Sequence, residues 1–322
     1  MRVVLCYPVE THHLDRIAAA CPIGTEIVDA GQGRIAVELL EADIFCGHAK
    51  VPVPWDEVVR RGRLRWIQSS AAGMDHCLVP SVIASKITVT SASGLFADQV
   101  AEHTLALLTG WYRSMPAFYG AQQMRQFERL PTGDLHRKSI GIVGFGGNGR
   151  RLAEVLAPFR GRILATDLFP PKSPPAHVEA VWPAERLHDL LAEVEIAILC
   201  LPLNASTLGL IDSSALTAMR PGSLLVNVAR GQCVVERDLV EALRSGHLAG
   251  AALDVTEVEP LAADSPLWEM PNVIITPHVG AQSARRIDDT TDLVCDNLRR
   301  WFSDRPLRNV VDKQLGFPVP VE

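Results

Sequence analysis

Three polar residues, Arg230, Glu259 and His278, each follow a run of apolar residues that is typical of a buried strand. An arginine offers a planar fork suited to a carboxylate, and a histidine is the natural proton donor near neutral pH. A neighbouring carboxylate would favour the protonated form of such a histidine. Taken singly, each residue has an ordinary alternative: a surface arginine, an acidic turn, or a histidine capped after a proline. Together they would suit a site that binds a carboxylate and exchanges a proton.

The elements that must position these side chains are the apolar runs before them. Strands are predicted at 196–201, 224–228, 250–254 and 273–276. Their nearly continuous apolar character is typical of a parallel sheet that is covered on both faces. Because the carboxyl ends of parallel strands meet at one edge, where open α/β sheets bind ligands, we expect the three side chains to converge there.

The stretch from 139 to 167, SIGIVGFGGNGRRLAEVLAPFRGRILATD, predicts a strand, a glycine turn, a helix and a second strand. Gly144, Gly146 and Gly149 fall on the G-x-G-x-x-G spacing. The first glycine would permit the tight turn, the second would let backbone approach a pyrophosphate, and the third would let the helix press against the strand. The phosphates would then lie at the helix N-terminus. An ordinary glycine loop is the alternative, but the flanking strand and helix favour a dinucleotide site.

The second strand of this stretch ends at Asp167, eighteen residues past Gly149. An acid at this place can bind a ribose 2′-hydroxyl. It would repel a 2′-phosphate, and no arginine follows it directly, so the sequence favours NAD, with NADP as the less expected cofactor.

Residues 1 to 98 alternate short apolar runs with helical patterns, which favours parallel β-α repetition. Strands are predicted at 3–7, 26–29, 44–46, 64–68 and 87–90, and helices at 12–21 and 37–41. The last two strands lead into loops of small residues, 69–75 and 91–94. Such loops could form one wall of a ligand cleft, which Cys46 and His48 could also line, or they could simply mark tight turns.

The length of 322 residues predicts two domains. The substrate-binding domain is expected to comprise 1–98 plus 284–322, because a helical pattern after His278 and the tail at 309–311 can return to the first part of the chain. The NAD-binding domain is expected to comprise 99–283, which contains the glycine turn.

The region after Asp98 predicts a long helix, followed by a second helical run that Pro116 interrupts. It carries more aromatic residues than a connector needs, namely Trp111, Tyr112, Phe118, Tyr119 and Phe127. An exposed apolar patch of this kind usually marks an interface between domains or between subunits. We therefore expect a homodimer that forms through residues 100–130.

The bulk composition, 48% hydrophobic and 21% charged, is typical of a globular protein. No apolar run reaches the roughly 18 residues of a membrane helix, and no secretory signal is visible, so we expect a cytoplasmic location and no membrane partner. The net charge of -6, without a basic stripe, argues against nucleic acid. Seven scattered cysteines without a C-x-x-C pair indicate reduced thiols, and the histidines lack metal-ligand spacing, so no metal is predicted.

Beyond these features, the sequence resembles the D-isomer-specific 2-hydroxyacid dehydrogenases over essentially its whole length. The matching pieces are AAGMD at 71–75, VAEHTLAL at 100–107, GFGGNG at 144–149, LPLNAST at 201–207, VNVARG at 226–231, ALDVTEVEP at 252–260 and SPLWEMPNVIITPHVGA at 265–281. The resemblance implies an α/β fold of two Rossmann-like or flavodoxin-like domains, with parallel sheets, helices on both faces and a cleft between the domains.

The resemblance also implies catalytic roles. In that family, the residue matching Arg230 binds the substrate carboxylate and polarises the carbonyl, the one matching Glu259 tunes the histidine, and the one matching His278 exchanges the proton. Reduction of a 2-keto acid requires such groups, because negative charge develops on oxygen as hydride reaches carbon. The resemblance places the substrate carboxylate against backbone amides of Ala72 and Gly73. Leu95, Arg230 and His278 are the other expected substrate contacts.

Cofactor contacts are implied around the glycine turn and the neighbouring strand ends. They are expected at Gly144, Gly146, Gly147, Asn148, Gly149, Asp167, Leu201, Pro202, Thr207, Val228, Ala229, Asp254, His278 and Gly280. Two positions depart from the family pattern. Asn148 stands where a bulky apolar residue is common, and Asn204 where threonine is frequent. We expect a changed cofactor affinity from Asn148 and an unchanged fold.

The resemblance implies an NAD-dependent reductase of small 2-keto acids, which in reverse is a D-2-hydroxyacid dehydrogenase. The small pocket loops suit glyoxylate and hydroxypyruvate, but the sequence does not choose among these, phosphoglycerate and larger keto acids. Glu259 argues against formate, whose dehydrogenases have glutamine there, and Ala72 against phosphite, whose enzymes have lysine. The alternative is an NAD-sensing binding protein or transcriptional co-regulator on the same fold.

Overall fold

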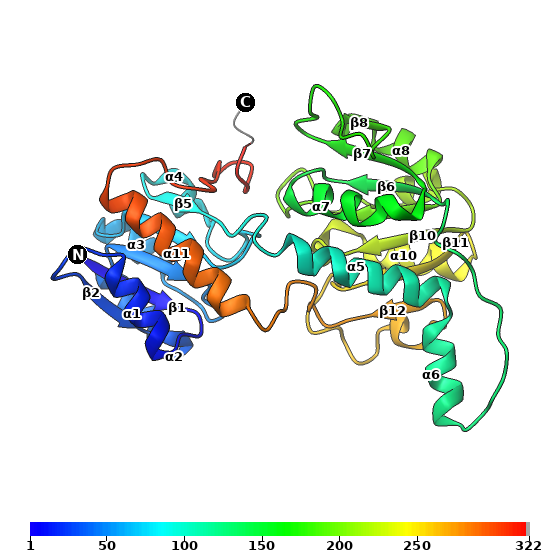
Figure 1. Ribbon diagram of the computed structural model, residues 1–322, viewed down its shortest axis with the longest axis horizontal. Helices are drawn as coiled ribbons and strands as arrows, with labels where there is room; N and C mark the ends of the chain where they lie inside the picture. The colour runs from blue at the N-terminus through cyan, green and yellow to red at the C-terminus, as the bar shows by residue number, and fades with distance from the viewer. Residues whose placement is uncertain (320–322) are drawn as a thin grey trace. The chain divides into compact units, whose positions relative to one another are not determined.

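The computed structural model describes residues 1–319 and forms two compact units (Figure 1). The first unit comprises Met1–Phe96 and the chain from Ser283 onward, and the second comprises Ala97–Gln282. Each unit is built on its own parallel sheet. The predicted α/β class with parallel sheets and helices on both faces is therefore confirmed.

The first unit holds a five-stranded sheet in the order β2-β1-β3-β4-β5, in which all neighbours are parallel. Its strands are β1 (Arg2–Cys6), β2 (Glu26–Asp29), β3 (Ile44–Gly47), β4 (Trp66–Ser69) and β5 (Thr88–Thr90). The strand order reverses between β1 and β3. Doubly wound sheets bind ligands at such a switch point, outside the carboxyl ends of the strands.

Apolar cores lie on both faces of this sheet. Val4 and Cys6 of β1 join the core under α2, α3 and α4, whereas Val3 and Leu5 join the core under α1 and α11. This alternation with a period of two is what a strand buried on both faces requires. The helices are α1 (Thr11–Ala19), α2 (Gly31–Glu38), the 3-10 helix η1 (Leu39–Glu41), α3 (Trp55–Arg61), α4 (Pro80–Ala84) and α11 (Arg286–Phe302).

The second helix of this unit begins six residues earlier than the 37–41 pattern predicts. Gly31 and Gly33 stand in its first turn, and glycine is among the poorest helix formers, so local preference hides the start of the helix. Burial of Ile35 and Leu39 in the core stabilises it instead.

The C-terminal part of the chain packs into the first unit. Trp301 of α11 stacks on Trp66 of β4, with ring centroids 5.3 Å apart. Farther along, the backbone N–H of Val311 donates to the carbonyl of Val89 at 2.8 Å, and an antiparallel bridge joins Thr90 to Val310. These contacts attach the chain from 283 onward to β4 and β5.

The second unit holds a seven-stranded sheet in the order β12-β11-β10-β9-β6-β7-β8, again with parallel neighbours. Its strands are β6 (Ser139–Val143), β7 (Arg162–Asp167), β8 (Ala180–Pro183), β9 (Ile196–Leu199), β10 (Ser223–Asn227), β11 (Leu248–Leu253) and β12 (Val273–Ile275). The order reverses between β6 and β9, so the switch point lies directly beside the glycine turn that follows β6.

Helices cover both faces of this sheet (Figure 1). Residues of α5 and α7 share one core with the sheet, and residues of α8, α9 and α10 share the other. The bounds are α5 (Ala97–Tyr112), α6 (Met115–Gln123), α7 (Gly147–Leu156), η2 (Ala157–Phe159), η3 (Ala184–Arg186), α8 (Leu187–Glu193), α9 (Ser213–Ala218), η4 (Gly231–Cys233), α10 (Glu236–Arg244) and η5 (Pro266–Glu269).

Two details of the 98–127 region differ from expectation. Pro116 lies in the first turn of α6 and begins that helix instead of interrupting it, because a proline there removes no helical hydrogen bond. Trp111 and Tyr112 belong to the core on the α5 side of the sheet, so they are not part of an exposed patch. Tyr119 and Phe127 are exposed, at 60% and 105% of their reference areas.

All seven cysteines are free thiols, and most are buried. Among residues 1–319, no helix combines the length and the apolar character needed to cross a bilayer.

Candidate active site

The three strand-end residues lie after three neighbouring strands of the second sheet. Arg230 follows β10, Glu259 follows β11 and His278 follows β12, and these strands are consecutive in the sheet. Nδ1 of His278 lies 2.8 Å from Oε2 of Glu259. Because a carboxylate only accepts, Nδ1 carries the proton of this bond and Nε2 is the nitrogen left to face a ligand. Both side chains are partly exposed, at 46% and 37%.

The backbone of Arg230 is fixed by the buried Asn227 at the end of β10. The Asn227 amide donates to the Arg230 carbonyl at 3.0 Å, and its oxygen accepts from the Ala229 N–H at 3.0 Å. At the next residue, Gly231, a Cβ would lie 1.7 Å from the carbonyl oxygen of Thr256. Only glycine lets the loops after β10 and β11 approach this closely, which brings the Arg230 loop against the segment that leads to Glu259.

Asp254 holds the loop that carries His278. Its carboxylate accepts from the backbone N–H groups of Val279 at 2.9 Å and Gly280 at 2.8 Å, and its carbonyl accepts from the His278 N–H at 2.7 Å. His278 itself adopts a left-handed conformation, with φ of 53°. Since few residues other than glycine adopt this conformation without surrounding support, the Asp254 contacts explain how the loop is maintained.

Two further side chains, those of Thr276 and His103, contact the Asp254 carboxylate. The hydroxyl of Thr276 donates to Oδ1 of Asp254 at 2.7 Å, and Nε2 of His103 lies 3.2 Å from the same oxygen and 2.9 Å from the Thr276 hydroxyl. Burial would raise the pKa of Asp254, but hydrogen bonds from His103, Thr276 and the two amides outweigh it and lower the pKa to about 2. Asp254 therefore stays charged and holds the loop that carries His278.

The contacts of His103 with Asp254 and Thr276 were not predicted from the sequence. The available signal was a histidine between Val100 and Thr104, which lie on the buried face of α5. A polar ring beside that face requires a polar partner, but the partner is 151 positions away in the chain, at Asp254.

We expect Asp254→Asn to lower the free energy of unfolding by about 2 kcal/mol near pH 7, because the folded state holds the pKa of this carboxyl near 2, against 3.8 for the ordinary group. A lowered pKa stabilises the fold above about pH 4, and this contribution is lost as the pH falls towards 2. Urea unfolding near pH 7 and near pH 2 measures the difference in stability between the parent protein and Asp254→Asn, and the exposed Asp264→Asn is the control. An equal effect of Asp254→Asn near pH 7 and near pH 2 would show that charge is not responsible.

The glycine turn after β6 has the close approaches that a dinucleotide site requires. Gly144 has φ of 96°, and a Cβ there would lie 2.7 Å from the carbonyl oxygen of Cys200. A Cβ at Gly149 would lie 2.2 Å from the Gly144 carbonyl oxygen, so α7 packs directly against the turn. Around Gly146 there is open space within 4 Å. Helix α7 starts at Gly147 with no side-chain cap, which leaves its first amides directed at a ligand.

Asp167 has a structural partner in this turn. Its Oδ2 accepts from the Phe145 N–H at 2.6 Å, and its Oδ1 accepts from the Phe169 N–H at 2.8 Å. The carboxylate thus connects the end of β7 to the glycine turn, and each oxygen keeps a second lone pair for a hydroxyl. The residues at this edge of the sheet fit a dinucleotide.

Two glycine substitutions separate packing from cofactor binding. Gly149→Ala should destabilise the fold by about 1–3 kcal/mol and weaken NADH binding, because its methyl group would overlap the Gly144 carbonyl. Gly146→Ala should leave stability within about 1 kcal/mol of the parent, because its methyl enters open space, while it still weakens NADH binding. Chemical unfolding and NADH fluorescence titration measure the two effects. Unchanged NADH affinity in Gly146→Ala would show that the pyrophosphate does not bind at this turn.

The remaining predicted cofactor residues of the second unit lie at the carboxyl edge of its sheet. They are Leu201 and Pro202 after β9, Val228 and Ala229 after β10, Gly280 after β12, Thr207 in the turn after β9, and Gly147 and Asn148 at the start of α7. The Thr207 hydroxyl donates to the Pro202 carbonyl at 2.7 Å, and Oδ1 of Asn204 accepts from the Ser206 N–H at 2.9 Å. Thr207 and Asn204 thus build the turn after β9, and their contacts with a cofactor stay predictions.

The predicted substrate residues of the first unit lie in loops after β4 and β5. The Ser69 hydroxyl accepts from the Ala71 N–H at 3.0 Å, and the Ala71 carbonyl accepts from the Ala92 N–H at 2.9 Å, so the two small-residue loops are bonded to each other. Ala72 is exposed, Gly73 is buried and Leu95 is half-buried. Their contact with substrate stays a prediction.

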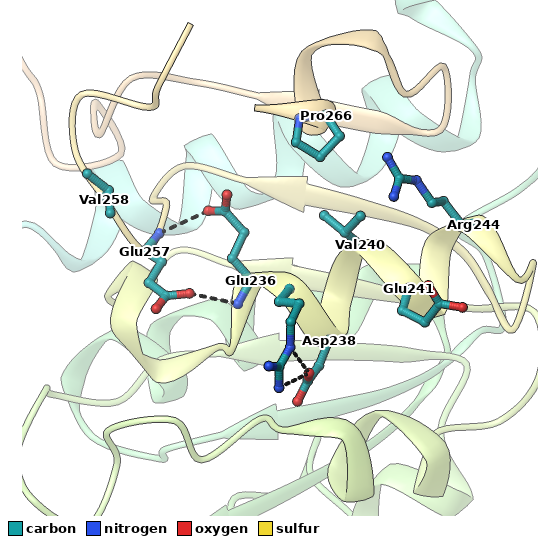
Figure 2. A pocket seen from close by; sticks show the side chains of 9 residues that line it. Glu236, Asp238, Val240, Glu241, Arg244, Glu257, Val258 and Pro266 are labelled. Carbon is teal, nitrogen blue, oxygen red and sulfur yellow. Dashed lines mark hydrogen bonds and ion pairs between the residues drawn. The ribbon is translucent and has the colours of Figure 1, made fainter. Parts of the chain in front are cut away.

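A groove of about 700 Å³ in the second unit lies apart from these residues, along α10 and the segment before Glu259 (Figure 2). In it, Glu257 accepts from the Glu236 N–H at 2.8 Å, while Glu236 accepts from the Glu257 N–H at 3.4 Å. This reciprocal pair attaches the loop that carries Glu259 to the N-terminus of α10. We assign the groove a structural role in holding that loop.

In the described part of the chain, His12, His13 and Asp288 lie close enough together to hold a metal ion. Arg16 also donates to Asp288, at 3.2 Å, and Nδ1 of His13 accepts from the Glu10 N–H at 3.0 Å. A cation therefore already lies against the carboxylate, and this arrangement suits an ion-paired contact between α1 and α11. The expectation that the chain uses no metal stays a prediction.

Comparison with known proteins identifies the family to which the second unit is similar. Residues 105–280 match the family model for the NAD-binding domain of D-isomer-specific 2-hydroxyacid dehydrogenases. The (S)-sulfolactate dehydrogenase of Chromohalobacter salexigens is 38% identical over 246 residues, which are 75% of this chain and 79% of that protein. Glyoxylate/hydroxypyruvate reductase A of Salmonella newport is 31% identical over 279 residues, 84% of this chain and 87% of that protein.

A solved structure agrees with these matches. The D-isomer-specific 2-hydroxyacid dehydrogenase of Xanthobacter autotrophicus, in complex with NADPH and MES, superposes with a TM-score of 0.78 at 29% identity, and covers 98% of this chain and 99% of that one. The chain spans only about half, 49%, of the length of the mycobacterial D-3-phosphoglycerate dehydrogenases that it also matches.

Proposed function

Because the chain belongs to the D-isomer-specific 2-hydroxyacid dehydrogenase family, we propose that it reduces small 2-keto acids to D-2-hydroxy acids with NADH, through Arg230, Glu259 and His278. The observation that supports this most is the 2.8 Å hydrogen bond between Glu259 and His278, which follow β11 and β12. Strand β11 pairs with β10, the strand before Arg230. The glycine turn belongs to the same unit. Family membership makes the chain an oxidoreductase of 2-hydroxy acids that uses a nicotinamide cofactor, and the residues' roles are the proposal.

In this proposal, Arg230, His278 and Asp254 have different tasks. The guanidinium of Arg230 binds the substrate carboxylate and polarises the neighbouring carbonyl. His278, whose Nδ1 is bonded to Glu259, gives the proton on Nε2 to the carbonyl oxygen as negative charge develops there. In the oxidation direction, the same nitrogen accepts the hydroxyl proton. When bound, the nicotinamide supplies or accepts the hydride. Asp254 is a positioning residue that holds the His278 loop.

We propose NAD as the cofactor in preference to NADP. Asp167 supports this, because its carboxylate at the end of β7 would repel a 2′-phosphate and can accept from a ribose hydroxyl. The Xanthobacter relative was solved with NADPH, so the choice of NAD rests on Asp167 and not on family membership. The proposed substrates follow the names of the relatives: glyoxylate or hydroxypyruvate, which have no second acidic group, or a 2-keto acid with a sulfonate or phosphate at C3.

A panel of 2-keto acids assayed with NADH and with NADPH tests this proposal. We expect at least one acid to be reduced, with kcat/KM for NADH above that for NADPH, and Asp167→Ala should narrow that preference. Preference of the parent protein for NADPH would overturn the role given to Asp167, and no oxidation of either cofactor with any acid would overturn the enzymatic function.

The alternative of an NAD-sensing binding protein or co-regulator is not favoured. The relatives with named activities reported above are dehydrogenases and reductases. A paired histidine and glutamate also serve proton exchange, which binding alone does not require.

We further propose a cytoplasmic homodimer. Seven free cysteines support a reducing compartment. The exposed apolar side chains of Met115, Tyr119, Met124 and Phe127 on and after α6 support burial against a second copy. Sedimentation at micromolar concentration measures the assembly, and a mass of only 35.1 kDa would contradict the dimer.

A further inference from the structure

A pair of histidines lies at the switch point of the first unit's sheet. His48 comes directly after β3, whose neighbours are β1 and β4, and His76 follows the turn after β4. Their rings stack, with centroids 4.0 Å apart and planes inclined by 29°. Ligands of doubly wound sheets bind at the edge where these histidines lie.

The backbone around His48 is fixed by several hydrogen bonds. Its N–H donates to the Cys6 carbonyl at 3.0 Å, and its carbonyl accepts from the Gln32 amide at 2.9 Å. The same Gln32 accepts from the Lys50 N–H at 2.7 Å. Before His48, a Cβ at Gly47 would lie 2.5 Å from the Cys6 carbonyl oxygen, so β3 and β1 are held closely there. The ring of His48 is therefore presented from a rigid loop.

His76 is connected to the predicted substrate loop. Its Nε2 lies 3.3 Å from the hydroxyl of Ser69, which also accepts from the Ala71 N–H. The Ser69 hydroxyl therefore connects the His76 ring to the turn that contains Ala72 and Gly73. His48 and His76 are both half-buried, whereas Ser69 is buried.

The chemistry of such a pair favours an anion. An acidic group bound to both imidazoles would accept a hydrogen bond from each ring, and its negative charge would strengthen these bonds. The nearby Cys6 thiol stays neutral, because burial raises its pKa to about 11. The charged residues nearest in the chain, Lys50 and Asp75, are both exposed.

We propose that His48 and His76 form an anion subsite in the first unit, and that it takes a second acidic group of the substrate, a sulfonate or phosphate at C3 of a 2-keto acid. This inference rests on the proposed function and selects one of its two substrate classes. The backbone amides of Ala72 and Gly73 would hold the carboxylate at C1, and the histidine pair would recognise the group that glyoxylate and hydroxypyruvate lack.

The test measures kcat/KM with NADH for 3-sulfopyruvate, 3-phosphohydroxypyruvate and glyoxylate. We expect the parent protein to prefer one of the two acidic substrates over glyoxylate, and His48→Asn and His76→Asn each to reduce that preference by about tenfold, as the loss of one charge-assisted hydrogen bond predicts. The exposed His136→Asn is the matched control and should leave the ratio unchanged.

Failure of the anion subsite and failure of the proposed reductase function give different results. A parent protein that reduces glyoxylate but neither acidic substrate overturns the subsite and keeps the reductase. Histidine variants that lower activity on all substrates equally also overturn it, because a purely structural role has that effect. A parent protein that reduces none of the acids overturns the proposed function itself.

Discussion

His278→Asn should lower kcat for 2-keto acid reduction by roughly 10²- to 10⁴-fold, the usual contribution of a positioned proton donor. Asparagine suits this test because it tolerates the left-handed backbone that His278 adopts, with φ of 53°. The loop should therefore keep its hydrogen bonds to Asp254, and NADH affinity should stay close to that of the parent. Steady-state kinetics together with NADH titration measure both quantities.

Glu259→Gln is the matched variant for this prediction. An amide of the same size can still bond to His278 Nδ1 but carries no charge to stabilise the protonated ring, so kcat should fall by less than in His278→Asn, about tenfold. The two substitutions together should cost little more than His278→Asn alone, because they act on one proton transfer. Reduction at the parent rate by His278→Asn, with NADH still bound, would show that another group donates the proton.

Arg230→Gln should lower kcat/KM for every 2-keto acid by roughly 10²- to 10³-fold, because the substrate carboxylate would lose a charged, two-pronged partner. Arg230→Lys should recover only part of the loss, since an ammonium group cannot supply the planar fork. NADH affinity should not change. The comparison requires kinetics with at least two keto acids of different side chain.

Arg220→Gln is the control for charge, because its side chain is exposed in the segment before β10, at the opposite end of that strand from Arg230. It removes the same charge and should leave kcat/KM within about twofold of the parent. If Arg230→Gln raised KM for NADH and left keto-acid binding intact, Arg230 would belong to the cofactor site and the assignment would be wrong.

Much of the fold followed from local pattern. Continuous apolar runs gave strands within one or two residues of β9, β10 and β12, because strands of a covered parallel sheet are built mainly from apolar residues. The glycine spacing before α7 identified its close approach to the turn, since only glycine fits at Gly149. Strand β8, however, was not predicted, because it covers only four residues and ends at Pro183, a residue type that is uncommon inside strands.

Local sequence pattern predicted only part of the candidate site. Arg230, Glu259 and His278 stand directly after strands, so the sequence predicted their common edge, and the structure brings Glu259 and His278 into contact. The contact of His103 with Asp254 joins a helix to a distant strand end, which no local pattern contains.

The aromatic residues of α5 and α6 illustrate a further limit of local reasoning. Trp111 and Tyr112 entered the core because α5 packs against β11, while Tyr119 stayed exposed on α6. Aromatic content alone does not distinguish a core face from an interface, since both bury large apolar side chains.

The configuration and amount of product formed from hydroxypyruvate test the central claim most directly. The protein is incubated with NADH and hydroxypyruvate, NADH consumption is recorded, and the glycerate formed is resolved by chiral chromatography. We expect one D-glycerate for each NADH oxidised, and at most about one hundredth of that amount with His278→Asn over the same time. Formation of L-glycerate, or NADH consumption without glycerate, would contradict it.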